Sequence, residues 1–242
     1  MNPTITMCIT NACNLNCSIK TEGHNCIAGT NNNGRDAAVM LDLNLALEWR
    51  EKFLPNSPVH ISGGEPFLHP DIKEGLINCV DRGIDTTVFS NGTLLLDNSW
   101  CYELPLKWCL TYHKKVRRSF FLKNIEKLKD KQHLICEIFT TKTPEKIQGF
   151  DSFNTLPIKA NSGYYNFGEK INIKNSCPNH GILLIGTRGE IFSCSNPSIQ
   201  YGDVYTMTFD KKRAEQFRCH AKKYPNKCHT MQNAYLFSQM KG

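Results

Sequence analysis

Apolar and polar residues follow two alternating periods along the first two thirds of the chain. Alternation with a period of two, as in TITMCIT (4–10), gives way to apolar stripes at helical spacing, as in DLNLALEWREKF (42–53). The pattern predicts strands over 4–10, 58–62, 85–90, 106–112, 133–141 and 156–160, and helices over 42–53, 69–83 and 116–131. Such repeated strand–helix units favour parallel strands with covering helices, in an open doubly wound sheet or in a full or partial barrel.

The pattern changes near residue 162. The segment GILLIGTRGEIFSC (181–194) predicts a β-hairpin around its Thr-Arg-Gly-Glu turn, and residues 209–235 predict a helix interrupted near Pro225. We therefore expect an α/β core domain over 1–165. A small α+β domain, consisting of the hairpin and the helix, is expected over 166–242.

Composition narrows the class of protein. The chain has 242 residues, of which 40% are hydrophobic, so it can bury a sizeable core. Its net charge of +7 comes mainly from 114–131 and 211–227, which are either two solvated helix faces or a phosphate-binding rim suited to nucleic acid. No apolar run approaches the roughly 20 residues of a membrane span, and the first residues lack the pattern of a secretory signal. We expect a cytoplasmic protein that does not enter a membrane.

The twelve cysteines form an N-terminal group, a scattered middle set and a C-terminal group. Cytosolic thiols stay reduced, so these residues are expected to bind metal or to do chemistry rather than to form disulfides. The middle set is the exception. Cys79 lies on the apolar stripe of a predicted helix, Cys109 and Cys136 lie in predicted strands, and buried free cysteine packs as a small hydrophobe. The role of Cys101 stays open.

Three loops follow predicted strands at the carboxyl end, where the functional groups of βα folds gather. They are the cysteine loop after the first strand, Gly63-Gly64-Glu65-Pro66 after the second, and Ser90-Asn91-Gly92-Thr93 after the third. The glycines would let the backbone approach a ligand closely. Glu65 could accept an ammonium group, and Asn91 could bond to ribose hydroxyls. Parallel neighbouring strands would place all three loops on one rim.

At this point the chain resembles the radical S-adenosylmethionine (SAM) superfamily. The matching segments are ITNACNLNC, ISGGEPFLHPDI and TTVFSNGTLL, in the family's order, and the resemblance covers nearly all of residues 3 to 140. It implies a partial (β/α)6 barrel, which is a TIM-like fold. It also implies a [4Fe–4S] cluster on Cys13, Cys17 and Cys26, since three thiolates hold three irons and leave the fourth open for SAM.

The resemblance also implies roles for the other two loops. Gly63, Gly64 and Glu65 would receive the methionine amino group of SAM, while Ser90 and Asn91 would lie near its ribose. Reduction of the cluster, by a donor such as flavodoxin or ferredoxin, would cleave SAM to a 5′-deoxyadenosyl radical that takes a hydrogen atom from the substrate. The barrel would align the acceptor carbon and exclude water.

The third cysteine departs from the family. Cys13 and Cys17 have the usual three residues between them, but eight residues separate Cys17 from Cys26, where the family has two. Cys8 could complete the site, although it lies mid-strand, and His24 could replace a thiolate, as imidazole does in some clusters. Cys26 remains our choice, because the entropic cost of closing a loop rises only slowly with its length.

The C-terminal cysteines resemble the "twitch" domain of radical SAM enzymes, a shortened relative of the SPASM domain. Cys177 is followed by eleven residues, Gly189, four residues and Cys194, and GDVY (202–205) resembles the segment that follows in such domains. With Cys219 and Cys228 they would bind an auxiliary [4Fe–4S] cluster. The alternatives are no metal or a zinc site, for which the further candidate ligands are His180, His220 and His229.

Two further residues are candidates for contact with SAM or substrate. Glu137 lies inside an otherwise apolar strand and could face the barrel interior, or it could be an ordinary outward-facing glutamate. His113 follows the fourth strand on the active rim, where it could equally be an ordinary loop histidine.

Three functions are compatible with these residues. We favour a radical SAM enzyme, of oxidoreductase or isomerase type, that oxidises, rearranges or cross-links a peptide or small polar metabolite. The same chemistry on a nucleic-acid base or hypermodified nucleotide is the alternative, for which the charge of +7 is the one pointer. A zinc-binding adaptor without catalysis is the alternative from another class.

Overall fold

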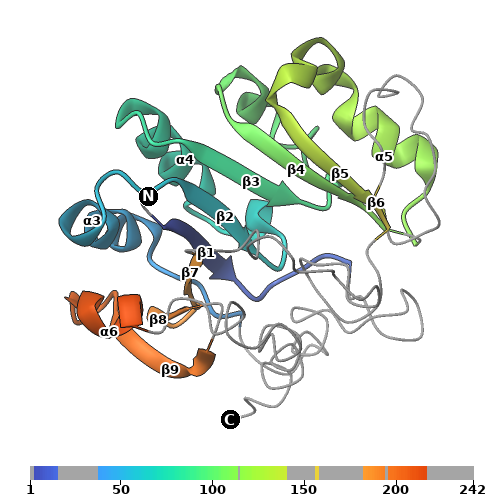
Figure 1. Ribbon diagram of the computed structural model, residues 1–242. Coiled ribbons are helices and arrows are strands. Elements are labelled where there is room, and N and C mark those ends of the chain that lie inside the picture. The colour runs from blue at the N-terminus through green and yellow to red at the C-terminus, as the bar shows by residue number, and fades with distance from the viewer. Residues whose placement is uncertain are drawn as a thin grey trace, which may run out of the picture.

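One mixed sheet runs through the residues that the computed structural model describes, namely 3–15, 38–113, 115–140, 156–157, 182–193 and 196–216. Over those residues it has ten strands in the order β10-β9-β8-β7-β1-β2-β3-β4-β5-β6 (Figure 1). The strands are β1 (Thr4–Thr10), β2 (Val59–Gly63), β3 (Thr86–Ser90), β4 (Lys107–Tyr112), β5 (Ile135–Thr140), β6 (Leu156–Pro157), β7 (Ile182–Ile185), β8 (Glu190–Ser193), β9 (Asn196–Asp203) and β10 (Thr208–Phe209). The α-helices are α3 (Leu43–Phe53), α4 (Ile72–Asp81), α5 (Arg118–Ile125) and α6 (Lys211–Gln216), and the 3-10 segments are η1 (Pro66–Leu68), η2 (Ser99–Glu103) and η3 (Glu126–Leu134).

The first six strands are parallel and stand in sequence order. Right-handed crossovers between parallel neighbours place all connecting helices on one face, and Figure 1 shows α3, α4 and α5 along the outer side of the sheet. A doubly wound sheet would reverse the order of its consecutive strands part-way, and strands β1 to β6 do not. The fold is therefore the mixed α/β type expected of a partial barrel, left open because β6 and β10 are the edges of the described sheet.

The predicted helices α3 and α4 begin or end at the capping residues that the sequence offers. Asp42 caps α3 by accepting a hydrogen bond from the Leu45 N–H (2.9 Å), and Gly83, with φ of +63°, follows the end of α4. The segment 116–131 differs from the prediction, because α5 gives way after Ile125 to the 3-10 turns of η3. At that point the side chain of Asn124 donates to the Phe120 carbonyl, which competes with regular helical bonding.

Strand alternation separates a buried apolar row from a polar one. The row that belongs to the hydrophobic core is 0–1% exposed, while the next row in register carries polar groups on the opposite face of the sheet. The rows are Met7, Ile61, Val88 and Trp108 on the core face, and Thr6, His60 and Thr87 on the other face. The period-two pattern of TITMCIT thus places its threonines on the face opposite the core row.

The predicted hairpin is confirmed as β7 and β8, and it joins the core sheet. Strand β7 pairs in parallel with β1, and β8 returns antiparallel to it. Strand β10 is held against α3, because the Trp49 Nε1–H donates to the Thr208 carbonyl (2.9 Å) and the Trp49 ring lies 5.0 Å from that of Phe209. The expected domains 1–165 and 166–242 stay a prediction, since 158–181 and 217–242 lie outside the described residues.

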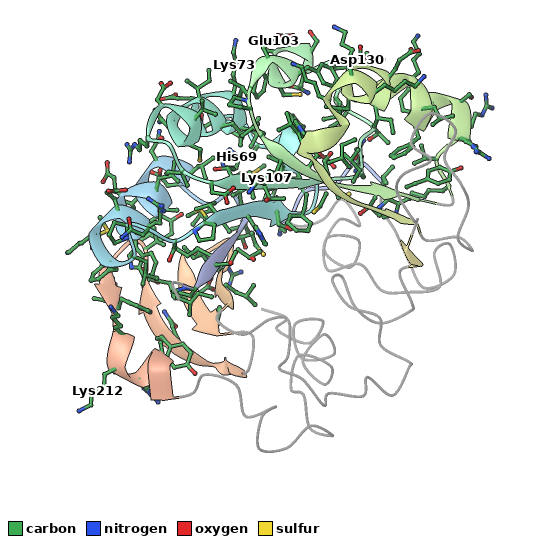
Figure 2. All side chains as sticks on the ribbon, turned by 45° about the horizontal axis from the view of Figure 1, so that its top comes forward. His69, Lys73, Glu103, Lys107, Asp130 and Lys212 are labelled. Atoms are coloured by element: carbon green, nitrogen blue, oxygen red, sulfur yellow. The ribbon has the colours of Figure 1, made fainter. Side chains whose placement is uncertain are left out.

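Charged side chains cover the outer surface, where Lys73, Glu103 and Asp130 stand clear of the fold (Figure 2). The basic segment 114–131 mixes its exposed lysines with acidic residues, as in the Lys129–Glu126 ion pair (3.6 Å). This agrees with a solvated helix face there. None of the helices in the described part of the chain is long and apolar enough to cross a membrane.

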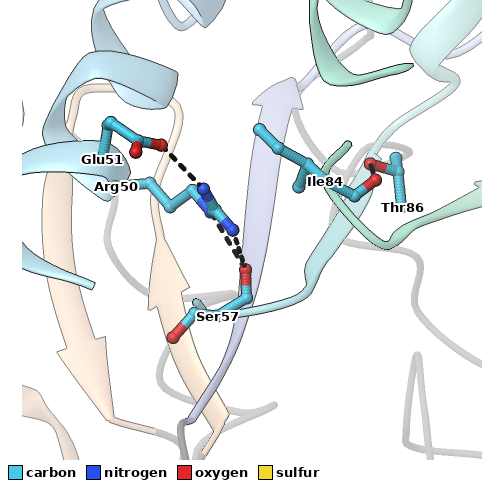
Figure 3. Close-up of polar contacts among 5 residues, drawn as sticks. All are labelled: Arg50, Glu51, Ser57, Ile84 and Thr86. Carbon is cyan, nitrogen blue, oxygen red and sulfur yellow. Dashed lines mark hydrogen bonds and ion pairs between the residues drawn. The ribbon is translucent and has the colours of Figure 1, made fainter. Parts of the chain in front are cut away.

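A buried arginine holds the connection from α3 to β2 (Figure 3). Arg50 is 5% exposed, and its Nε and Nη2 donate to the Ser57 carbonyl at 2.9 and 2.8 Å. Its Nη1 pairs with Glu51 at 2.9 Å, which compensates the charge. These bonds fix the turn that precedes β2, and with it the direction in which β2 runs through the sheet.

Candidate functional site

The carboxyl ends of β1 to β4 bring the three motif loops to one edge of the sheet. The cysteine loop begins after Thr10, the Gly63-Gly64-Glu65 loop follows β2, and the Ser90-Asn91 loop follows β3. His113 lies at the same edge, directly after β4. The rim expected from the sequence is therefore present over the described residues.

The glycine loop is joined to the cysteine loop by backbone hydrogen bonds. The Gly64 N–H donates to the Thr10 carbonyl and the Glu65 N–H to the Ala12 carbonyl, both at 2.7 Å. Gly63 has φ of +135°, and a Cβ on it would stand 2.4 Å from the Thr10 oxygen. Only glycine permits this approach, so the first glycine of the motif has a structural requirement of its own.

The carboxylate of Glu65 lies behind the rim and binds the chain itself. Glu65 is fully buried, with 0% of its surface exposed. Its Oε1 accepts from the Ser90 hydroxyl (2.9 Å) and from the Phe67 N–H (3.3 Å), and its Oε2 accepts from the Asn91 N–H (2.8 Å). The side chain that could receive an ammonium group thus also ties the loop after β2 to the loop after β3.

Burial raises the pKa of Glu65 to about 7, because removal from water disfavours the charged form more than the bonds from Asn91, Ser90 and Phe67 favour it. Between pH 4.5 and about 7, the folded protein therefore keeps Glu65 protonated, whereas the unfolded chain has lost that proton. A raised carboxyl pKa lowers stability as pH rises, in the window between about 4.5 and about 7.

We expect the pH dependence of folding to report this carboxyl group. Between pH 4.5 and 7 the free energy of unfolding of the cofactor-free protein should fall by about 3 kcal/mol on account of Glu65. Glu65→Gln does not titrate, so urea unfolding of this variant across the same range should show a smaller fall. Glu74→Gln, on the exposed side of α4, is the control for loss of one carboxylate. Equal pH dependence in the wild type and Glu65→Gln would contradict the assignment.

Asn91 is buried at 6% exposure and hydrogen-bonds across to the cysteine loop. Its Oδ1 accepts from the Thr93 N–H (2.9 Å) and the Thr93 hydroxyl (2.5 Å), and its Nδ2 donates to Asn14 Oδ1 (2.9 Å). The same Nδ2 lies 4.0 Å from Cys13 Sγ. Ser90 is also engaged, since its hydroxyl accepts from the Gly92 N–H (3.0 Å). The contact of Ser90 and Asn91 with ribose stays a prediction.

Two residues that the sequence did not single out help to build the edge. Asn14 links the cysteine loop to Thr93, donating from Nδ2 to its hydroxyl (2.8 Å). His69, buried at 3% exposure (Figure 2), bonds through Nε2 to the Leu41 carbonyl (2.8 Å), while its Nδ1 accepts from the Asp71 N–H (3.1 Å). Asn14 could have been noticed in the sequence, because it is a polar residue between the two candidate ligands Cys13 and Cys17. Nothing in the sequence indicated that His69 would bond to Leu41.

Several predicted site residues cannot be placed from the structure. The cysteines at 17, 26, 177, 194, 219 and 228, and the histidines at 24, 180, 220 and 229, lie outside the described residues. Position 137 is placed by its backbone alone, where it pairs in register with Cys109 on β4. Cys79 and Cys109 are buried, as expected of core positions, and Cys101, whose role the sequence left open, is buried as well.

The described part of the site fits a thiolate cluster. Cys13 Sγ accepts the Leu15 N–H (3.5 Å) and faces the Asn91 amide, and such donors favour a negatively charged sulfur. The other two proposed thiolates lie beyond the described range. Among the described residues, no three His, Cys, Asp or Glu side chains are grouped to hold a metal ion.

Comparison with known proteins identifies a solved structure that has the same fold. No protein-family model and no curated protein matches the chain. Among solved structures, it superimposes on BtrN in complex with AdoMet and 2-DOIA with a TM-score of 0.53 and 11% identity, covering 97% of this chain and 90% of that one. The chain shares the fold of BtrN.

A second structure, Streptococcus suis SuiB bound to S-adenosylmethionine, gives a TM-score of 0.48 and 12% identity over 91% of this chain and 66% of that one. At 11% identity, the likeness to BtrN shows a shared architecture alone. The activity must be argued from the site itself.

Proposed function

We propose that this protein is a radical SAM enzyme. The observation that carries the proposal is the meeting of three motif loops at the carboxyl edge of a parallel sheet, joined by hydrogen bonds in a fold shared with BtrN. BtrN was solved in complex with AdoMet, which supports SAM as a ligand of this chain. Cys13, Cys17 and Cys26 would hold a [4Fe–4S] cluster, which would supply the electron for cleavage of SAM to methionine and a 5′-deoxyadenosyl radical able to abstract hydrogen from the substrate.

The chain's own contribution is to bind and orient. The backbone of Gly63 and Gly64 would receive the methionine amino group, and Gly63 is exposed to do so. Glu65 would act from behind them, either on that amino group or by holding the loop against β3. His113 and Glu137 are proposed to contact SAM or substrate from β4 and β5. The polar groups on the face of the sheet that carries Thr6 suit a peptide or small polar metabolite as substrate.

The C-terminal cysteines are proposed to bind an auxiliary [4Fe–4S] cluster. Supporting this, the hairpin that lies between Cys177 and Cys194 in the sequence forms as β7 and β8, and the pairing of Leu183 with Ser193 brings its two ends together. An auxiliary cluster could accept the second electron when a substrate radical is oxidised, which favours an oxidoreductase.

The proposal is tested by anaerobic reconstitution with iron and sulfide, followed by incubation with SAM and a reductant. We expect a brown protein holding about four irons for one cluster or about eight for two, and 5′-deoxyadenosine in the products. The iron is measured by elemental analysis and the nucleoside by chromatography. Colourless protein that takes up zinc in place of iron would instead favour the non-catalytic zinc-binding adaptor.

A further inference from the structure

A ring of hydrogen bonds connects two motif loops beside Cys13. The Asn91 Nδ2 donates to Asn14 Oδ1 (2.9 Å), the Asn14 Nδ2 donates to Thr93 Oγ1 (2.8 Å), and the Thr93 hydroxyl donates to Asn91 Oδ1 (2.5 Å). Every bond runs in the same sense, so each group is donor to one neighbour and acceptor from the other. Chains of this kind polarise one another and hold their members in a single arrangement.

The ring settles which way the Asn91 amide points. Its oxygen accepts both the Thr93 N–H (2.9 Å) and the Thr93 hydroxyl, and a flipped amide would set N–H groups against those two donors. Asn91 and Thr93 are buried, at 6% and 5% exposure, so the flipped state would leave polar groups without partners away from water. The amide nitrogen is therefore locked on the side of the cysteine loop.

That nitrogen faces the Cys13 sulfur at 4.0 Å, while the Leu15 N–H donates to the same sulfur at 3.5 Å. A neutral thiol is a weak acceptor, which accounts for the long distance. A sulfur that loses its proton on binding iron becomes a stronger acceptor, so the N–H already directed at it would be drawn closer. The ring thus presents a fixed positive dipole end to a proposed cluster ligand.

We propose that the Asn14–Asn91 amide pair is a positioning site for the cluster. Asn91 donates to the Cys13 sulfur and Asn14 holds it there, so that together they stabilise the reduced, more negative cluster and raise its reduction potential. Hydrogen bonds to cluster ligands are a known determinant of that potential. The inference rests on the proposed function, and it gives Asn91 a role in addition to any contact with ribose.

A half-buried pair of asparagines between two helices serves as the matched control. Asn78 on α4 donates from Nδ2 to Asn44 Oδ1 on α3 at 2.8 Å, which is the same bond that Asn91 makes with Asn14. Asn78→Asp therefore puts a carboxylate in place of an amide opposite an asparagine oxygen, on helices that cover the sheet. Its effect on the protein's net charge equals that of Asn91→Asp.

The test is a redox titration of the reconstituted SAM-binding cluster, followed by electron paramagnetic resonance, in the wild type, Asn91→Asp, Asn14→Ala and Asn78→Asp. Any auxiliary cluster is distinguished by its own spectrum. We expect a more negative potential in Asn91→Asp and a smaller shift of the same sign in Asn14→Ala, which changes no charge and keeps the Thr93 bonds to Asn91. Asn78→Asp should match the wild type.

Each outcome decides a different claim. Potentials of Asn91→Asp and Asn14→Ala equal to that of Asn78→Asp would overturn the inference while leaving the radical SAM proposal intact. Failure of the wild type to assemble a cluster would refute the proposed function itself. Should Asn91→Asp fail to fold, Asn14→Ala decides alone, because the exposed Asn14 can lose its side chain without opening a buried cavity.

Discussion

Cys13→Ala is expected to abolish cluster assembly and SAM cleavage while leaving the protein folded. Cys13 is half-buried against the hydrophobic core, so loss of its sulfur should cost only about 1 kcal/mol of stability. The same sulfur is one of three proposed iron ligands, and a cubane held by two thiolates loses its protein anchor. Iron content, the 5′-deoxyadenosine produced and the urea midpoint should therefore separate the two effects.

Cys79→Ala is the matched control for this replacement. Cys79 is fully buried in α4, so its loss leaves a small cavity and should cost about 1 to 2 kcal/mol, at least as much as Cys13→Ala. Its iron content and SAM cleavage should equal those of the wild type. A Cys13→Ala protein with full iron content and undiminished cleavage would remove Cys13 from the ligand set.

Gly63→Ala is expected to cost about 3 to 5 kcal/mol of unfolding free energy and to prevent SAM binding. The added methyl would stand 2.4 Å from the Thr10 carbonyl oxygen and 3.0 Å from the Thr10 nitrogen, and both are backbone atoms that no rotamer change can move. The φ of +135° adds strain for any residue with a Cβ. Relief requires β2 to withdraw from β1, which would pull the glycine loop away from Cys13.

Gly83→Ala serves as a control that measures the loss of unfolding free energy caused by positive φ alone, without a steric clash. Gly83 also has positive φ, at +63°, but an added Cβ meets nothing within 4 Å. Its replacement should therefore cost roughly 1 kcal/mol and leave SAM binding unchanged. Urea unfolding and SAM-binding isotherms of the two variants provide the comparison. Equal costs for the two substitutions would mean that contact with Thr10 is unimportant.

Most of the fold could be predicted, because each element carries its own local signal. The alternation in TITMCIT and the cap at Asp42 act over a few residues and survive in the folded chain. The end of α5 at Ile125 could not be predicted, since it coincides with a hydrogen bond that the Asn124 amide donates to the Phe120 carbonyl and one that its oxygen accepts from the distant Leu96 N–H. The place of the hairpin next to β1 was equally out of reach, because pairing between strands far apart in sequence leaves no local mark.

For the candidate site, the sequence by itself determined which residues meet. Parallel strands in chain order carry their following loops to one edge, so the cysteine, glycine and Ser-Asn loops had to converge once the strands formed. What only the tertiary structure decided is what those side chains bond to. Glu65 is turned to Ser90 and Asn91, and Asn91 to Asn14 and Cys13. Hydrogen bonds depend on distances and angles that neither composition nor spacing encodes, and these emerge only when the loops pack.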